Sequence, residues 1–165
     1  MKNIFKEQAE AYALLTISIA GVSLLFALIL EHAFGLKPCP LCLMQRFWVF
    51  LAGLCGFISI LHAPRWGIYP LAAMVSSLCG AIFAFRHLYI QNLPADQSAS
   101  CNAPIGIMWE QNYPLIDILA AITQGAGNCS EVTASLGGFS IPAGALIIFL
   151  AIIAAAAMQM RAGLR

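Results

Sequence analysis

Charged residues are scarce in this chain: Asp, Glu, Lys and Arg together make up 9% of its 165 residues, and the formal net charge is only +1. So weak a charge provides no basic surface for binding nucleic acid. The sequence also lacks a glycine-rich phosphate loop, an internal repeat and any haem, flavin or iron–sulfur signature. Catalysis is therefore expected to depend on the cysteines or on a cofactor that is bound without those motifs.

Hydrophobic residues, in contrast, account for 61% of the chain, and the mean hydropathy is +0.86. Both values exceed those of soluble globular domains and predict a membrane protein. A chain of 165 residues accommodates about four spanning helices of ~20 residues each, which leaves no room for a soluble catalytic domain. The first apolar run is too long for a signal-peptide core and has no obvious cleavage site, so we expect it to be a retained anchor.

The apolar runs predict an all-α membrane protein, a four-transmembrane-helix bundle that forms a single domain over residues 1–165. Four crossings place both termini on the same side of the membrane. The connections on the opposite side are expected at about 31–42 and 88–140. The predicted spanning helices cover about 11–30, 43–61, 68–87 and 141–160.

The distribution of Lys and Arg predicts the orientation, because short cytoplasmic segments accumulate these residues. The long segment 91–140 contains neither, but it has the acidic residues Asp96, Glu110, Asp117 and Glu131. We therefore expect this segment outside and both termini in the cytoplasm. The cytoplasmic side is marked by Lys2, Lys6, Arg65, Arg161 and Arg165.

A short apolar stretch at 114–122 interrupts the acidic loop and is too short to cross a bilayer. It predicts a helix that lies flat on the membrane surface. Trp109 and Tyr113 precede it, and such aromatic residues favour the headgroup region. Cys101 comes before this stretch and Cys129 follows it.

The pair Cys39 and Cys42 lies where the first outer connection meets the second apolar run. Pro40 suits the first turn of a helix, so Cys42 is expected near a helix N-terminus, where unpaired amides and the dipole favour a thiolate. Arg46 follows Cys42 by four residues, which places its cation on the same helix face, roughly 5–6 Å away. A lowered pKa of the Cys42 thiol is the expected result. This arrangement favours redox chemistry in the oxidising compartment, which Cys101 and Cys129 share.

Other interpretations of the cysteines are weaker. A Cys-x-x-Cys pair also fits a zinc site, but the further ligands on the same side are the other cysteine pair, His32 and His87, and none has metal-like spacing, so no metal is expected. The pair Cys101 and Cys129 could be a static staple rather than a relay for soluble clients. Within the apolar runs, Cys55 and Cys79 are expected to be small buried hydrophobes.

The remaining polar candidates each have a structural alternative. Arg46 could extend to the headgroups as a membrane anchor rather than contact a cofactor. His87, at the outer end of the third run, could be an interfacial residue rather than a functional contact, and the same applies more strongly to His32 and Arg86. His62 is expected simply to end the second helix.

With these residues assembled, the chain resembles the disulfide bond formation protein B (DsbB) family, bacterial inner-membrane enzymes that reoxidise the periplasmic thiol oxidase DsbA with quinone. The resemblance extends over the whole chain. Its motifs are His32, Leu36-Lys37-Pro38-Cys39-x-x-Cys42, Arg46, the acidic loop with Cys101 and Cys129, and Ile141-Pro142 at the start of the last helix.

The resemblance implies a role for each matching residue. Cys101 would be the sulfur attacked by the partner's thiolate, with Cys129 as its disulfide mate, and Cys39 would exchange with Cys129. Cys42 would face the quinone ring. Arg46 would lie beside the ring oxygens, and His87 matches a histidine near that pocket.

The function that the sequence indicates is thus a quinone-dependent disulfide oxidase for a periplasmic DsbA-like dithiol protein, with ubiquinone or menaquinone as cofactor. Its partners would be that protein, the membrane quinone pool and the lipid bilayer, with no role for nucleic acid. One alternative is a paralogue that serves a dedicated partner. Another is a non-enzymatic membrane subunit in which the outer cysteines are structural or bind metal. Bound quinone and fast thiol turnover in the purified protein would support the enzyme, whereas stoichiometric zinc without quinone would support the subunit.

Overall fold

The computed structural model describes residues 2–35, 38–63, 66–92, 111, 114, 116–117, 135–136 and 139–164. Four long helices dominate this part of the chain, which confirms the predicted all-α membrane bundle. They are α1 (Lys2–Phe34), α2 (Pro40–His62), α3 (Ile68–Gln91) and α6 (Ile141–Leu164). The strands β1 (Ser135–Leu136) and β2 (Phe139–Ser140) form a small antiparallel pair, which the sequence did not predict, immediately before α6.

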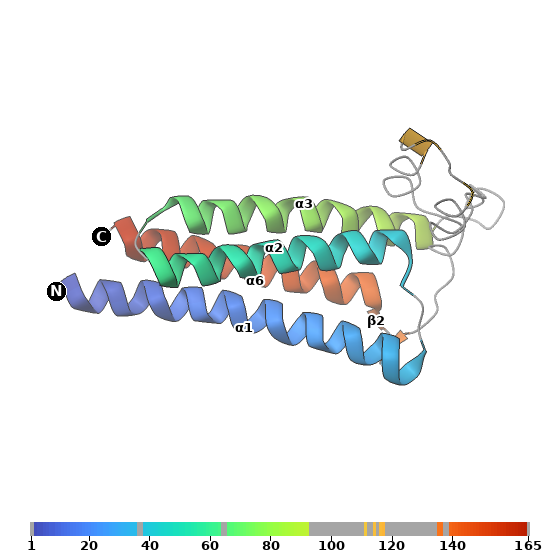
Figure 1. Cartoon of the computed structure of the whole chain (residues 1–165), viewed down its shortest axis with the longest axis horizontal. Coiled ribbons are helices and arrows are strands. Elements are labelled where there is room, and N and C mark those ends of the chain that lie inside the picture. Colours follow the sequence, from blue (N-terminus) through green and yellow to red (C-terminus); the bar gives the residue numbers. More distant parts are fainter. Residues whose placement is uncertain are drawn as a thin grey trace.

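The four helices lie side by side, and each packs against two neighbours in the cyclic order α1, α2, α3, α6. The start of α1 and the end of α6 lie at one end of the bundle, and the connection from α1 to α2 lies at the other (Figure 1). We call the latter the outer end. Each predicted span falls inside one of the four helices. α1 continues to Phe34 and α2 begins at Pro40, so the connection expected at 31–42 is shorter than predicted.

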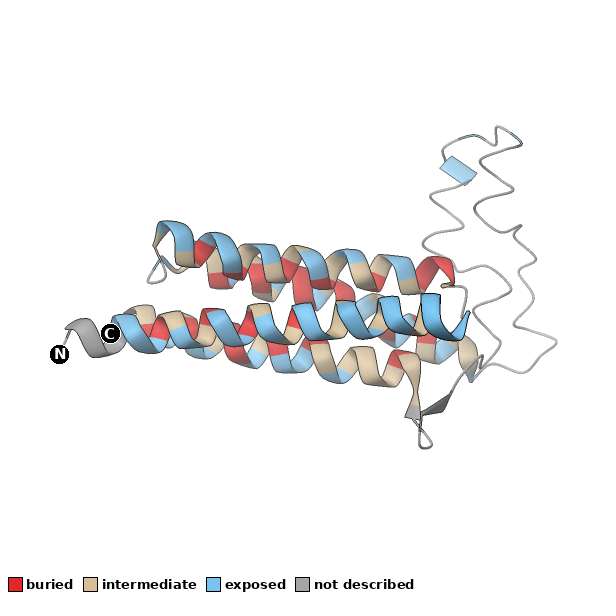
Figure 2. Cartoon of the chain, turned by 60° about the horizontal axis from the view of Figure 1, so that its bottom comes forward, coloured by how far each residue is buried: buried red, intermediate tan, exposed pale blue. Residues whose placement is uncertain are grey.

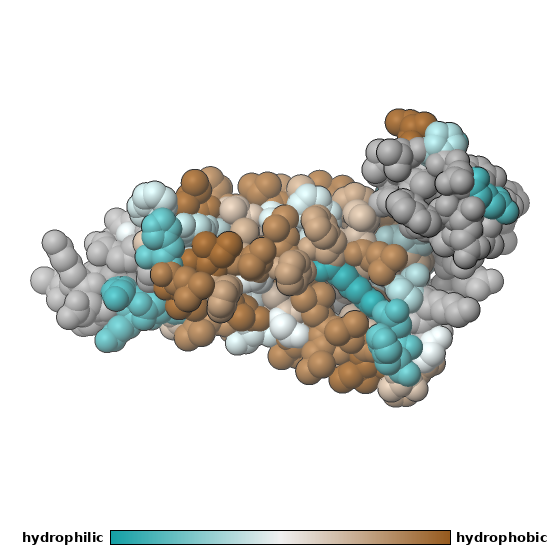
Figure 3. All heavy atoms as spheres, in the orientation of Figure 1, coloured by the Kyte–Doolittle hydropathy of each residue, from teal (hydrophilic) through white to brown (hydrophobic). Residues whose placement is uncertain are grey.

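Most of the buried apolar residues are small, with Leu41, Phe149 and Ile152 among the exceptions, and many large apolar side chains cover the outside of the bundle. Ala52 and Ala84 are completely buried, whereas Leu61 and Phe85 are 70% and 66% exposed. Figure 2 shows the buried residues on the inward faces, and Figure 3 shows hydrophobic side chains over most of the visible helical surface. All four helices are long and apolar enough to cross a membrane. This is the pattern of a multi-pass membrane protein, in which lipid solvates the large apolar residues and small ones allow close helix approach.

One close approach fixes α3 against α6. A Cβ at Gly80 would lie 2.2 Å from the ring of Phe149, which is completely buried, so only glycine fits at this position. His87 is seven residues further along α3 and therefore on nearly the same helix face as Gly80. The contact that sets the rotation of α3 thus also sets the direction of His87.

The expected surface helix at 114–122 lies largely outside the described residues; within it, Asp117 N donates to Pro114 O at 2.9 Å. Cys101 and Cys129 also lie outside the described residues.

A dithiol and a histidine at the outer end of the bundle

Cys39 and Cys42 are held by the first turn of α2. Cys39 is the N-cap residue and Pro40 occupies the first turn, as expected for a ring that fixes φ and has no N–H. The backbone N–H of Cys42 donates to Cys39 Sγ at 3.4 Å. The helix-terminal amide therefore contacts the first sulfur of the pair, and the lowered pKa expected for the Cys42 thiol stays a prediction.

The two sulfurs lie 3.1 Å apart, and both residues are thiols. His87 of α3 adds a ring nitrogen to each of them. Its Nε2 lies 3.8 Å from Cys39 Sγ, and its Nδ1 lies 3.9 Å from Cys42 Sγ. Cys39 is 9% exposed and His87 is 3% exposed, so water has little access to these groups. The structure thus brings together three of the residues that the sequence singled out.

Gln45 completes this cluster and was missed in the sequence. It is 5% exposed, and its Nε2 lies 3.4 Å from His87 Nδ1. With the amide donating, Nδ1 is an acceptor and the ring proton is on Nε2, directed at Cys39. Its spacing could have identified it. Gln45 follows Cys42 by three residues, so it is a polar side chain on the same helix face as the cysteine in an otherwise apolar segment.

Two alternative donors face His87 Nδ1, because its single lone pair accepts either from the Gln45 amide or from the Cys42 thiol. The Cys39 thiol donates to Cys42 Sγ. The Cys42 thiol can donate to His87 Nδ1, and Nε2–H can return to Cys39. The cluster is walled by Leu41, which is completely buried, with Phe83 and Ile90 of α3 packed against it. Such a site can move a proton between the sulfurs through His87, which is buried, while Cys42 remains half-buried.

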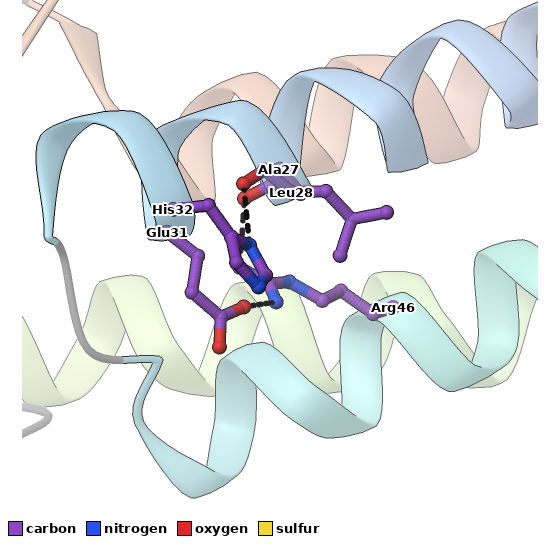
Figure 4. A network of polar contacts seen from close by, with 5 residues as sticks. All are labelled: Ala27, Leu28, Glu31, His32 and Arg46. Carbon is purple, nitrogen blue, oxygen red and sulfur yellow. Dashed lines mark hydrogen bonds and ion pairs between the residues drawn. The ribbon is translucent and has the colours of Figure 1, made fainter.

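Arg46 is directed away from this cluster, toward α1. Its guanidinium forms an ion pair with Glu31 through Nη1, and its Nη2 donates to the Ala27 carbonyl at 3.1 Å (Figure 4). The side chains of Arg46 and Glu31 are 23% and 31% exposed. Arg46 thus has specific partners on another helix, which its position four residues after Cys42 could not reveal. Glu31, like Gln45, was not singled out as a site residue in the sequence.

The remaining candidates lie apart from the dithiol. His32 is exposed, and its Nδ1 donates to the Leu28 carbonyl at 3.0 Å (Figure 4). Cys55 follows Cys42 by 13 residues on the same helix, which is about 20 Å along the axis. Cys79 precedes His87 by eight residues, about 12 Å along α3. His62 ends α2, as predicted, and contacts Tyr69.

The fold and the site together define a class: multi-pass membrane proteins that carry a vicinal dithiol at one end of a helical bundle. Within this class, the family model "Disulfide bond formation protein DsbB" matches residues 9–159. The chain belongs to the DsbB family. It is a disulfide oxidase and hence an oxidoreductase.

Individual relatives agree with this assignment, and each is named disulfide bond formation protein B. The protein of Saccharophagus degradans is 37% identical over 139 residues, covering 82% of this chain and 83% of the relative. That of Chromohalobacter salexigens is 39% identical over 127 residues, covering 74% and 73%. That of Acinetobacter baylyi is 34% identical over 147 residues, covering 87% and 84%. No solved structure matches the chain significantly.

Proposed function

We propose that this protein is a quinone-dependent disulfide oxidase of the bacterial inner membrane that reoxidises a periplasmic DsbA-like dithiol protein. The observation that carries the proposal is the contact of His87 with both sulfurs of the dithiol at the outer end of the bundle. The orientation is supported by charge: Lys6 and Arg161 lie toward the other end, where short cytoplasmic segments collect cations. The outer end would then face the periplasm.

The proposed electron path runs through two disulfides. The thiolate of the partner attacks Cys101, and the Cys101–Cys129 disulfide is reduced to two thiols while the partner gains its disulfide. The Cys129 thiolate then attacks Cys39, so that the Cys39–Cys42 disulfide opens and Cys42 leaves as the thiolate. Cys101 next attacks Cys129 in the Cys129–Cys39 mixed disulfide, which re-forms the Cys101–Cys129 disulfide and releases Cys39 as the second thiolate. Each exchange transfers two electrons and, once the thiolates are protonated, two protons. When bound, the quinone supplies the acceptor for this pair of electrons and protons.

The residues of the cluster support the last exchange in specific ways. Negative charge on Cys39 is stabilised by the N–H of Cys42, 3.4 Å away. His87 can accept a proton from one sulfur at Nδ1 and donate one to the other from Nε2. The Gln45 amide also contacts Nδ1 and must give up this hydrogen bond when Nδ1 takes a proton from a sulfur. Leu41, Phe83 and Ile90 place apolar side chains against the dithiol, although Cys42 itself is only half-buried.

The residues near Cys42 fit a quinone. Such a head group requires an apolar surface for its ring and donors for its two oxygens. Leu43 and Phe47 are 43% and 51% exposed, and they directly follow Cys42 and Arg46 in α2. Arg46 has five N–H donors, and two of them serve the contacts with Glu31 and Ala27. We therefore propose that Arg46 and His87 hold the ring oxygens and that Cys42 faces the ring.

Arg46→Lys should raise the apparent KM for quinone roughly ten- to hundredfold. Lysine retains the charge but loses the planar fork, and a lost charge-assisted hydrogen bond costs about 1.5–3 kcal/mol. Membrane insertion and topology should not change. The measurement is the quinone dependence of turnover, with Arg161→Lys at the opposite end of the bundle as the matched control. A wild-type quinone KM in Arg46→Lys would show that Arg46 does not contact the quinone and serves only as a membrane anchor and a link to α1.

The proposal as a whole predicts different results for the two cysteine pairs. Cys101→Ala or Cys129→Ala should abolish oxidation of the protein partner, while the variant still retains quinone and oxidises small dithiols through Cys39 and Cys42. The measurements are extraction of quinone from the purified protein and turnover with each type of substrate. Purified wild-type protein without bound quinone and without quinone-dependent turnover would refute the proposed function. Loop variants that lose quinone would instead show that the loop builds the quinone site.

A further inference from the structure

We infer that the reduced form of the cluster formed by Cys39, Cys42 and His87 is also a reversible binding site for Zn²⁺, and that the bound ion holds the enzyme in its reduced state. The two sulfurs and one imidazole nitrogen lie within 4.8 Å of one another. Thiolate sulfur and imidazole nitrogen are the ligands that zinc prefers. The inference rests on this geometry and goes beyond the oxidase reaction.

The distances require a rearrangement on the scale of side-chain rotation. With Zn–S at about 2.3 Å and Zn–N at about 2.0–2.1 Å, a tetrahedral site places its sulfurs about 3.8 Å apart and each sulfur about 3.6 Å from the nitrogen. His87 Nε2 already lies 3.8 Å from Cys39 Sγ. The nitrogen that lies 3.9 Å from Cys42 Sγ is Nδ1, so Cys42 Sγ would have to move toward Nε2 within a group of atoms that spans 4.8 Å at most. The sulfurs, now 3.1 Å apart, would have to separate by about 0.7 Å, which rotation of the cysteine side chains can supply.

The electrostatics of the site also suit the ion. A divalent cation on two thiolates and a neutral imidazole has no net charge, so the complex avoids the large cost of placing an isolated charge in a buried site. The nearby cation Arg46 is already paired with Glu31, which reduces its repulsion of a metal. The N–H of Cys42 donates to Cys39 Sγ and would stabilise the thiolate ligand.

The surroundings of the histidine fit a metal ligand as well. A ligating imidazole usually donates its second ring N–H to a neighbouring acceptor, which fixes the ring. Gln45 lies 3.4 Å from Nδ1, and rotation of its amide would present Oε1 to Nδ1–H while Nε2 binds the ion. Three protein ligands leave a fourth position for water, as in exchangeable zinc sites rather than closed structural ones.

Binding would depend on the redox state of the pair. Two thiols lose two protons as the ion binds, and no electron is transferred. The disulfide offers no thiolate, so oxidation removes two of the three ligands. Conversely, bound zinc occupies the lone pairs that both sulfurs need for disulfide formation. Zinc should therefore inhibit turnover by capturing the reduced intermediate, and a chelator should restore activity.

The sequence did not indicate this site, because spacing along the chain gave no metal pattern. His87 follows Cys42 by 45 residues. Only the packing of α3 against α2 supplies the third ligand. The sequence predicts no permanently bound metal. The inferred ion differs from such a metal because it binds only the reduced form and leaves on oxidation.

The test uses the full chain with Cys101→Ala and Cys129→Ala, so that the loop cysteines cannot bind metal. The protein is reduced with a phosphine, freed of reductant and titrated with Zn²⁺ alone. Co²⁺ serves as a second probe, because tetrahedral thiolate ligation gives charge-transfer and visible d–d absorption. We expect one Zn²⁺ per reduced chain and at least about tenfold weaker binding after oxidation with diamide, since the thiolate ligands are lost.

His87→Ala should weaken binding to the reduced protein by at least about tenfold, because even residues that only support a ligand contribute that much. The matched control is His32→Ala, which removes an exposed histidine at the same end of the bundle. If His87→Ala does not fold, Cys42→Ser provides the same test by removing a thiolate. Equal binding of Zn²⁺ by the reduced and the oxidised protein would overturn the inference and indicate an adventitious ion only. Wild-type Zn²⁺ binding by a folded His87→Ala or Cys42→Ser protein would do the same.

The oxidase and the metal site can fail independently. Quinone-dependent dithiol oxidation measured in EDTA tests the oxidase without any metal. Activity in EDTA combined with no Zn²⁺ binding would refute the metal site alone. Redox-dependent Zn²⁺ binding without quinone-dependent turnover would refute the proposed function alone.

Discussion

Cys39→Ser is expected to abolish steady-state oxidation of dithiols, with a loss of about 10³-fold or more, as is typical when a covalent catalytic group is removed. Serine cannot form the disulfide with Cys42, whose sulfur lies 3.1 Å from that of Cys39 in the wild-type protein. Cys101→Ser should be equally inactive toward the protein partner because it removes the proposed entry point. The measurement is quinone-dependent oxidation of a reduced partner protein by purified variants.

The matched control is the double variant Cys55→Ala and Cys79→Ala. Both residues are thiols on α2 and α3, so the double variant tests whether any cysteine within the membrane contributes. Because they lie about 20 Å from Cys42 and about 12 Å from His87 along their helices, activity should be largely retained. A folded but inactive double variant, or substantial activity in Cys39→Ser, would show that the relay is assigned to the wrong sulfurs.

His87→Ala is expected to lower kcat for the oxidation of small dithiols by about 10²-fold, the lower range for loss of general acid–base catalysis. His87 contacts both sulfurs, and its imidazole can accept a proton at one ring nitrogen and donate one from the other. His87→Gln preserves a hydrogen-bonding side chain but cannot exchange protons in this way, so it should remain slow. If the role is only to fill space, His87→Gln should recover the activity.

The kinetic assay for His87 is best performed with purified protein at saturating quinone, so that kcat is measured separately from quinone affinity. His32→Ala is the control, since this exposed histidine donates only to the Leu28 carbonyl on its own helix. Added imidazole should partly restore His87→Ala if proton transfer is the missing step. A folded His87→Ala protein with wild-type kcat would show that the sulfurs lose their protons by another route.

The contribution of Arg46 combines two effects that the structure separates. Its guanidinium links α2 to α1 through Glu31 and Ala27, so Arg46→Lys affects packing as well as any quinone contact. A packing defect should lower the thermal stability and leave the quinone KM near its wild-type value. Loss of a quinone contact should raise the quinone KM and leave the thermal stability near its wild-type value. Measuring both quantities on the same variant therefore identifies which contact matters.

The sequence alone determined the class of fold and half of the site. Apolar runs of membrane length specify spanning helices wherever they occur, because every backbone polar group must be satisfied within the bilayer. The proximity of Cys39 and Cys42 is also determined by the local sequence. The two residues are three positions apart, and Pro40 starts the helix, so the sulfurs meet in its first turn. The loop cysteines Cys101 and Cys129 depend on resemblance to the family for their roles.

Only the tertiary structure decided which groups surround the dithiol. Hydropathy identifies a lipid-soluble helix but contains little information on its rotation or axial offset relative to its neighbours. These are set by close contacts such as that of Gly80 with Phe149, and they direct His87 onto both sulfurs. The same packing brings Arg46 to Glu31 on α1 rather than leaving it beneath Cys42. Spacing along one helix predicts neighbours within that helix, whereas neighbours on other helices depend on how small and large side chains interlock across the bundle.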